Sequence, residues 1–213
     1  MDVVRRSDSR DHQKAAGASN DAWAAGYFNE CMSGFEWQVA THMLHEGMVV
    51  EGLAVARTIH DRYHAKKRNP FNEVECGDHY ARAMASYGIL LAVTGFEHDG
   101  PAGHIGFAPR LPGDDFRAPF TACEGHGTYE QKQGKQGLEC VVRVRSGRLR
   151  LRTIGIAPAP GPARPLRGVM LLREPAAREP LGARIEESPG RLLVRLANEV
   201  VIAAGQAVAV TFG

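Results

Sequence analysis

Apolar positions recur at helical spacing early in the chain. The spacing of Phe35, Val39 and Met43 predicts a helix, and Gly47 is expected to end it, because glycine commonly follows the last turn of a helix. A second apolar stripe covers one face of residues 49–64 and predicts another helix directly afterwards. The first part of the ordered chain is therefore expected to be helical.

The pattern predicts a third helix over residues 78–94, where apolar and small residues cover much of the circumference. A helix of that composition is expected to lie buried between neighbours. Beyond Gly95 the period changes from helical to alternating, which is typical of strands. Strands are expected over residues 116–123, 128–131, 138–145, 148–154, 169–173, 183–187, 191–196 and 200–212. Ser146 and Gly147 are expected to form the two-residue turn of a hairpin.

These patterns predict an α+β organisation in which helices come first and an antiparallel β tail follows. Residues 1–20 are polar and charged and lack the apolar centre of a secretory signal, so a disordered leader is expected there. Four prolines within residues 158–165 indicate a linker. The expected regions are a leader over 1–20, a helical region over 21–112, a β hairpin region over 113–157, a Pro-rich linker over 158–168 and a C-terminal antiparallel β unit over 169–213.

Composition narrows the class of protein. Of the 213 residues 44% are hydrophobic, which is typical of a soluble globular chain, and no apolar run is long enough to predict a transmembrane helix. The four cysteines, Cys31, Cys76, Cys123 and Cys140, are widely spaced and form no Cys-x-x-Cys pair. That spacing fits reduced thiols in the cytosol better than a disulfide framework or a zinc ribbon, so a cytoplasmic location is expected.

Charge is unevenly distributed along the chain. Residues 1–137 carry 14 Lys and Arg against 18 Asp and Glu, a net −4, whereas residues 138–213 carry 12 against 6, a net +6. A basic segment can bind nucleic acid. Here, however, arginines alternate with apolar residues over 148–152, which indicates the water-facing side of a strand. No nucleic-acid partner is expected.

The candidate site is a junction between a loop and the third helix. Pro70 prevents the preceding helix from continuing, and Asp78 is a good residue to begin the next one. Between and beyond these two positions the sequence places Glu73, His79 and Arg82. Glu73 offers hydrogen-bond acceptors and Arg82 a rigid set of donors, a combination suited to neighbouring sugar hydroxyls. The alternative is an ion pair that ties the loop to its helix.

A family resemblance adds to this interpretation. Five blocks carry it: residues 26–30 (GYFNE), 34–38 (GFEWQ), 61–63 (DRY), 67–70 (KRNP) and 73–86 (EVECGDHYARAMAS). Together they look like the C-terminal end of the catalytic region of glycoside hydrolase family 116. This family includes bacterial β-glucosidases and non-lysosomal glucosylceramidases. The resemblance covers residues 23–127, and the sequence after Gly137 carries no motif of the family.

The resemblance implies that the helices are the terminal helices of an (α/α)6 barrel. It also implies retaining hydrolysis of β-glucosides, with Glu73 and Arg82 binding the sugar. His79, in the same first turns of the helix as Arg82, is a further candidate substrate-binding residue beside them. Such hydrolysis needs a nucleophile and an acid/base carboxyl group, which in the family lie far upstream. The chain is therefore expected to keep part of a sugar-binding subsite without catalytic residues, with the remainder of the barrel on another chain as one possible partner.

Other interpretations stay open. Glu73 and Glu75 are two residues apart, so in an extended loop their side chains point to opposite sides and do not form an acid/base pair. His60 and His64 could share a helix face, but no third metal ligand stands at diagnostic spacing, so no metal or cofactor is expected. A non-catalytic carbohydrate- or partner-binding remnant is the main alternative, and a basic β module that binds anionic polymers is a third.

Overall fold

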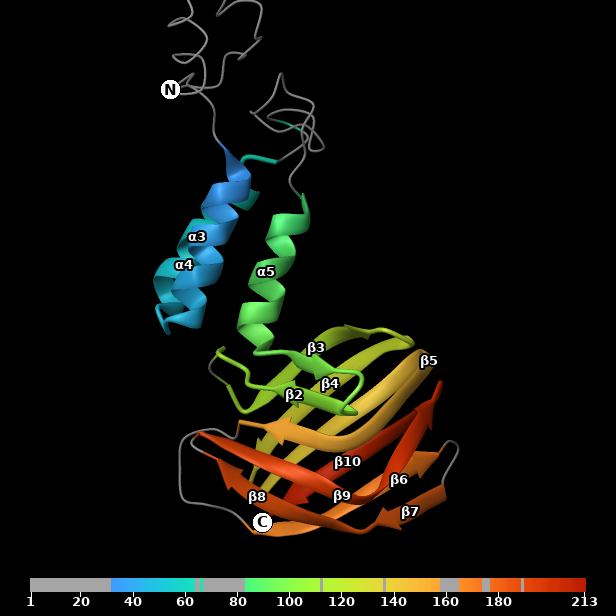
Figure 1. Ribbon diagram of the computed structural model, residues 1–213. Helices are drawn as coiled ribbons and strands as arrows, with labels where there is room; N and C mark the ends of the chain where they lie inside the picture. The colour runs from blue at the N-terminus through green and yellow to red at the C-terminus, as the bar shows by residue number, and fades with distance from the viewer. Residues whose placement is uncertain are drawn as a thin grey trace, which may run out of the picture. The chain divides into compact units, whose positions relative to one another are not determined.

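The computed structural model describes residues 32–63, 66, 83–111, 113–135, 137–157, 165–173, 177–188 and 190–213. The chain divides into two compact units, Met1–Ala92 and Val93–Gly213. The first contains helices and the second contains strands (Figure 1). None of the described helices is long and apolar enough to cross a membrane.

Among the described residues, three helices lie in or extend from the first unit: α3 (Ser33–His45), α4 (Val49–His60) and α5 (Ala83–Thr94). Helices α3 and α4 pack through Leu44 and Ile59, which are fully buried. Gly52 permits this approach, because a side chain there would meet the carbonyl oxygen of Ala40 at 2.9 Å. The ion pair between Arg62 and Glu36 joins the end of α4 to the start of α3.

The described residues of the second unit form a sheet of ten strands. The strands are β1 (Glu97–Asp99), β2 (His104–Phe107), β3 (Asp115–Ala122), β4 (Gly125–Gly134), β5 (Gly137–Ile156), β6 (Leu166–Arg173), β7 (Ala177–Leu181), β8 (Ala183–Ser188), β9 (Arg191–Ala203) and β10 (Gln206–Phe212). Strands β2 and β5 pair in parallel, and the other recorded pairs are antiparallel.

Strand β5 joins the two halves of the sheet. Residues 138–147 pair with β4 on one side. Within this stretch, residues 138–143 also pair with β10 on the other side. Residues 148–156 pair instead with β9, and residues 153–156 pair with β2 as well. The change of neighbours falls at Gly147, which has a φ of +72°, a backbone conformation that glycine adopts without steric cost. The strand bends there, so one continuous strand serves both halves (Figure 1).

Alternating apolar residues of both halves form one core. Phe107 of β2, Tyr129 of β4, Leu151 of β5 and Val210 of β10 are buried in the same cluster. Burying side chains of this size stabilises a fold by about 1.5–3 kcal/mol each, before the entropy cost of ordering them. Two of the edge strands, β3 and β7, each carry a proline, Pro119 and Pro180, a residue that disfavours the addition of a further strand.

The predicted fold class is wrong. Within the described residues the chain forms ten strands and three short helices, so it is not a terminal piece of an α-helical (α/α)6 barrel followed by a tail. Strands begin at Glu97, inside the region expected to be helical, and β2 pairs directly with β5. The segments expected as a tail share the core with β2 and β4. The hairpin turn expected at Ser146 and Gly147 is also wrong, because β5 continues through both residues.

Candidate functional site

The three residues predicted to bind sugar, Glu73, His79 and Arg82, lie outside the described residues. Their role therefore stays a prediction from sequence. Of the two histidines considered as metal ligands, His60 is the last residue of α4 and His64 lies outside the described residues. In the described part of the chain, no three His, Cys, Asp or Glu side chains gather closely enough to hold a metal ion.

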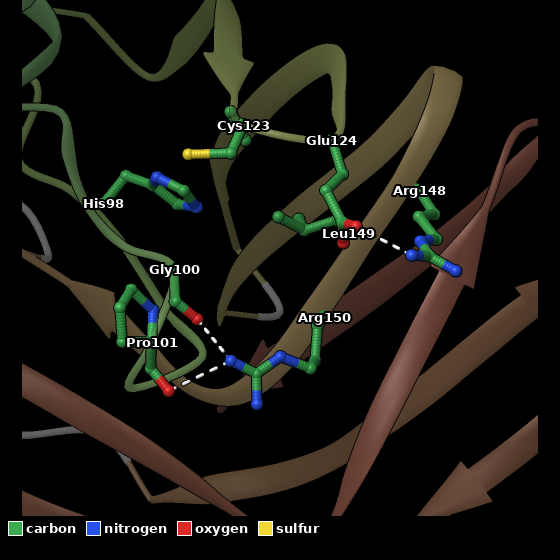
Figure 2. A pocket seen from close by; sticks show the side chains of 9 residues that line it. His98, Gly100, Pro101, Cys123, Glu124, Arg148, Leu149 and Arg150 are labelled. Atoms are coloured by element: carbon green, nitrogen blue, oxygen red, sulfur yellow. Dashed lines mark hydrogen bonds and ion pairs between the residues drawn. The ribbon is translucent and has the colours of Figure 1, made fainter.

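A hollow of about 410 Å³ lies in the β unit, where two turns meet the middle of β5. The turn between β1 and β2 contributes Gly100 and Pro101, and the turn between β3 and β4 contributes Cys123 and Glu124. Strand β5 contributes residues 148–150. The complete lining is His98, Gly100, Pro101, Ala122, Cys123, Glu124, Arg148, Leu149 and Arg150 (Figure 2). Segments about 25 residues apart in sequence thus form one surface.

Local sequence shapes the two turns. Asp99 is the last residue of β1 and accepts a hydrogen bond from the backbone N–H of Ala102 at 2.9 Å, which closes the first turn. Gly103 leaves that turn with a φ of +67°. The second turn is fastened to β5, because the backbone N–H of Arg148 donates to the carbonyl oxygen of Glu124 at 3.0 Å. Both turns are therefore held by hydrogen bonds within the chain, the first through the Asp99 side chain and the second through the backbone.

Glu124 and Arg148, which both line the hollow, form an ion pair. Arg148 Nη2 donates to Glu124 Oε1 at 2.7 Å (Figure 2). This hydrogen bond, together with the charge of the guanidinium, lowers the pKa of Glu124, and the carboxylate raises the pKa of Arg148. Both side chains are more than half exposed. The pair thus presents a carboxylate that only accepts hydrogen bonds beside a guanidinium that only donates them.

Arg150 holds one rim of the hollow in place. Its Nη2 donates to the carbonyl oxygens of Gly100 at 2.5 Å and Pro101 at 3.0 Å (Figure 2). Its Nη1 donates to Glu199 at 2.9 Å. Arg152 donates to the same carboxylate at 2.7 Å, and the hydrogen bonds from both arginines lower the pKa of Glu199, with Arg152 contributing most. One guanidinium therefore joins the first turn, β5 and β9.

The remaining lining is largely apolar. Leu149 is 3% exposed and forms part of the base, with Pro101 and Ala122 nearby. In Figure 2 the thiol of Cys123 points toward the ring of His98. That ring is stacked on Phe96, with ring centroids 6.3 Å apart and planes 7° apart. An apolar base beside a few fixed polar groups is typical of small-molecule sites.

Sequence reasoning did not select Glu124 and Arg148. Arg148 belongs to the alternating pattern that correctly predicted water-facing arginines: it is exposed, while Leu149 and Leu151 on the other side are buried. Glu124 follows the predicted strand that ends at Cys123, in a turn before Gly125. The pattern therefore located both residues on the surface. The pattern of apolar and polar residues did not predict that the turn between β3 and β4 contacts β5.

Comparison with known proteins does not assign a family. No protein-family model matches the chain, and no curated protein matches it. Among solved structures, the alpha-L-rhamnosidase from Dictyoglumus thermophilum aligns over 64% of this chain, with 10% sequence identity and a TM-score of 0.34. The alignment spans 14% of the length of that protein. A TM-score of this size does not establish a shared fold.

Proposed function

We propose that this chain is a non-catalytic carbohydrate-binding component of the β-glucosidase and glucosylceramidase type, which holds a β-glucoside without cleaving it. Two observations support the proposal. One is the sequence resemblance of residues 73–86 to glycoside hydrolase family 116. The other is the hollow at Glu124 and Arg148, which belongs to the described β unit. The proposal does not require the barrel that the resemblance implied.

The Glu124–Arg148 pair carries the proposal. Adjacent hydroxyl groups on a sugar each donate and accept hydrogen bonds, so a carboxylate beside a guanidinium can engage two of them together. Arg148 gives one hydrogen bond to Glu124, and a guanidinium has five N–H donors. Pro101 and Ala122, which line the hollow beside the buried Leu149, offer an apolar surface for the C–H face of the ring.

The same hollow lacks the groups that retaining hydrolysis requires. Such hydrolysis uses two carboxyl groups about 5–5.5 Å apart, one of which is protonated to assist the leaving group. Among the residues that line the hollow, Glu124 is the one carboxylic acid. Arg148 lowers its pKa, so Glu124 is ionised at neutral pH and has no proton to donate. Binding without turnover is the function this arrangement supports.

A polymer-binding role has weaker support. Arg148, Arg150 and Arg152 lie on one face of β5, but Glu124 and Glu199 pair with all three. The face thus carries a net charge of +1 from these five side chains, three guanidinium groups against two carboxylates. Binding to an anionic polymer depends on uncompensated positive charge. The ion pairs favour a small neutral ligand over a polymer.

Calorimetric titration of the full chain with methyl β-D-glucoside and methyl β-cellobioside tests the proposal. We expect saturable binding that Arg148→Ala weakens by about tenfold to a hundredfold, the effect of losing a charge-assisted hydrogen bond of roughly 1.5–3 kcal/mol. Arg178→Ala is the matched control, because Arg178 is exposed on β7 and lines no hollow described above. Hydrolysis of aryl β-glucosides should be undetectable.

A second pair of variants separates the two candidate sugar sites. Glu73→Gln with Arg82→Ala removes the site predicted from sequence, and Glu124→Gln with Arg148→Ala removes the one in the hollow. Loss of binding in the first variant alone would place the sugar at the sequence-predicted junction. No binding by the unmodified chain, or turnover of an aryl glucoside, would overturn the proposal.

A further inference from the structure

Strand β8 forms an edge of the sheet. Its one neighbour among the described strands is β9, and β1, β3 and β7 likewise have one neighbour each (Figure 1). Strand β1 has three residues, and β3 and β7 contain Pro119 and Pro180, so these three edges are poorly suited to adding a strand. Strand β8 has six residues and no proline. It is therefore the edge best able to pair with another chain.

The hydrogen bonds of β8 determine which of its backbone groups face outward. The N–H of Ala197 donates to the carbonyl oxygen of Gly182 at 2.8 Å, and the register of β8 with β9 continues from this pair without a bulge. Because bonded and non-bonded pairs alternate along an antiparallel ladder, every second residue after Gly182 bonds to β9. The residues between them turn their N–H and C=O groups to the open edge: Ala183, Ile185 and Glu187. Within the described residues, no strand or turn bonds to that edge.

The side chains of β8 alternate between the two faces of the sheet. Ile185 is partly buried against the core, and Arg184 and Glu186 lie on the opposite face. There Arg184 donates to Glu186 at 3.0 Å, and Arg195 of β9 donates to both carboxylate oxygens of Glu186 at 2.8 and 2.9 Å. The hydrogen bond from Arg195 is the main cause of a lowered pKa of Glu186. Strand β8 thus presents a cation and an anion two residues apart.

This spacing makes β8 complementary to itself. In an antiparallel pair of two β8 strands, the outward-facing residues must meet one another, and all three do so when the two-fold axis passes through Ile185. Arg184 of each copy then lies opposite Glu186 of the other, on the same face. Moving the axis by one residue would instead bring two Arg184 or two Glu186 side chains together. Opposite charges stabilise a cross-strand pair and like charges destabilise it, so charge selects the register centred on Ile185.

We propose that two copies of this chain associate through β8, edge to edge, about a two-fold axis at Ile185. Each hydrogen-bonded pair across the axis exchanges two backbone hydrogen bonds. The Ile185 side chains meet on the core side, beside Ala183 and Leu192, which are only partly buried in the single chain. The contact is isologous, since the same residues serve both copies. It shares no residue with the hollow at Glu124 and Arg148, so the sugar-binding proposal does not depend on it.

Sedimentation velocity of the full chain over a range of concentrations at low ionic strength tests the proposal. We expect a monomer–dimer equilibrium that Arg184→Glu weakens about tenfold or more, because glutamates then meet at both charged contacts. Glu186→Arg should weaken it similarly, because arginines meet there. An equimolar mixture of the two variants should dimerise again, since every charged contact in the mixed dimer joins opposite charges. Arg178→Glu, the same charge change on the edge strand β7, should have no effect.

Ile185→Pro keeps the test decisive if a charge variant fails to fold. The N–H of Ile185 faces away from β9, so proline removes a hydrogen bond of the dimer and none of the monomer. We expect this variant to keep its circular dichroism spectrum and to stay monomeric.

Amide hydrogen exchange supplies a direct measure of the contact. The amides of Ala183, Ile185 and Glu187 should exchange more slowly as the concentration of the chain rises, whereas those of Arg184 and Glu186, which already bond to β9, should change less. The proposal is overturned if the chain is monomeric at every concentration, or if mixing the two charge variants restores no dimer. Dimers that both charge variants and Ile185→Pro form as tightly as the parent would place the contact on another surface and overturn it equally.

Discussion

The ring of Phe107 on β2 stacks on the ring of Tyr129 on β4, with centroids 3.9 Å apart and planes 4° apart. Strand β2 pairs with the second half of β5, and β4 pairs with the first half. The stacked rings therefore join the two halves of the sheet across the bend at Gly147. Tyr129 is fully buried, and its hydroxyl donates to Gln131 Oε1 at 2.6 Å.

Removing the hydroxyl of Tyr129 should destabilise the β unit. In Tyr129→Phe the carbonyl group of Gln131, a residue that is itself buried, loses its donor, and an unsatisfied buried acceptor costs about 1–3 kcal/mol. Urea denaturation measures the change. A double variant, Tyr129→Phe with Gln131→Leu, should recover part of the loss because both polar partners are gone. A Tyr129→Phe chain as stable as the parent would show that this hydrogen bond does not stabilise the core.

The bend of β5 should not tolerate a side chain at Gly147. In Gly147→Ala the new methyl group would collide with the backbone carbonyl of Glu124, and the positive φ disfavours any residue with a side chain. We expect a loss of about 1–3 kcal/mol and weaker glucoside binding together, since Glu124 lies in the hollow. Gly134→Ala is the control, because nothing stands within 4 Å of its added atom. Equal stability of the two variants would contradict this account of the bend.

The alternation of apolar and polar residues predicted many strands of the β unit correctly. Strands expected over 169–173 and 183–187 correspond to β6 and β8. The break expected at Ala197 and Asn198 is wrong, because β9 continues to Ala203 and the chain turns at Gly205, which has a φ of +82°. Gly205 lies in a turn, whereas Gly147 lies within a strand. The presence of a glycine in the sequence therefore does not show whether a strand ends or continues there.

The pattern of apolar and polar residues could not predict two kinds of feature: short or edge strands, and contacts between side chains far apart in sequence. Strands β1 and β2 are short, with three and four residues, and too short to establish a period. Strand β7 contains Pro180, which argues against a central strand and is compatible only with an edge. The candidate site depends on the pairing of Glu124 with Arg148, 24 residues away. The hydrophobic pattern predicts which face of a strand is exposed to solvent. The register of the strands determines which exposed side chains contact one another.

The two described cysteines should differ in reactivity. Cys123 is exposed, whereas Cys140 is buried, and burial raises the pKa of the Cys140 thiol to about 12. In a chain that carries Cys31→Ser and Cys76→Ser, iodoacetamide should modify Cys123 rapidly and Cys140 only after unfolding, because the thiolate is the nucleophile. Mass spectrometry of the modified peptides measures both rates. Equal rates in the folded chain would contradict the buried position of Cys140.

The Cys140 thiol should also make stability depend on alkaline pH. Its ordinary pKa is 9.0 and its folded value is about 12, so between these values the unfolded chain releases a proton that the folded chain retains. The contribution is therefore complete below about pH 9 and is lost as the pH rises toward 12. Unfolding free energies should fall more steeply over this range in the parent chain than in Cys140→Ala. Parallel pH profiles would contradict the prediction.

The helical unit exposes large apolar side chains. Met84 is 90% exposed, Val50 77% and Phe35 62%. Exposed apolar patches of more than a few hundred Å² bind hydrophobic dyes and favour association. We expect the chain to enhance the fluorescence of a naphthalenesulfonate dye, and a variant with Phe35→Glu and Val50→Glu to do so several-fold less. A dye-silent parent chain would show that these side chains are covered in solution.

The sugar-binding proposal is tested most directly by amide chemical shifts of the labelled chain during titration with methyl β-D-glucoside. The account predicts saturable shifts at the amides of Gly100, Cys123, Glu124 and Arg148, which surround the hollow, with no hydrolysis of the glucoside. Arg148→Ala should require at least tenfold more glucoside to reach the same shifts, and the amide of the exposed Arg178 on β7 should stay unchanged. Shifts confined to residues outside the hollow, or none at all, would contradict a sugar site at Glu124 and Arg148.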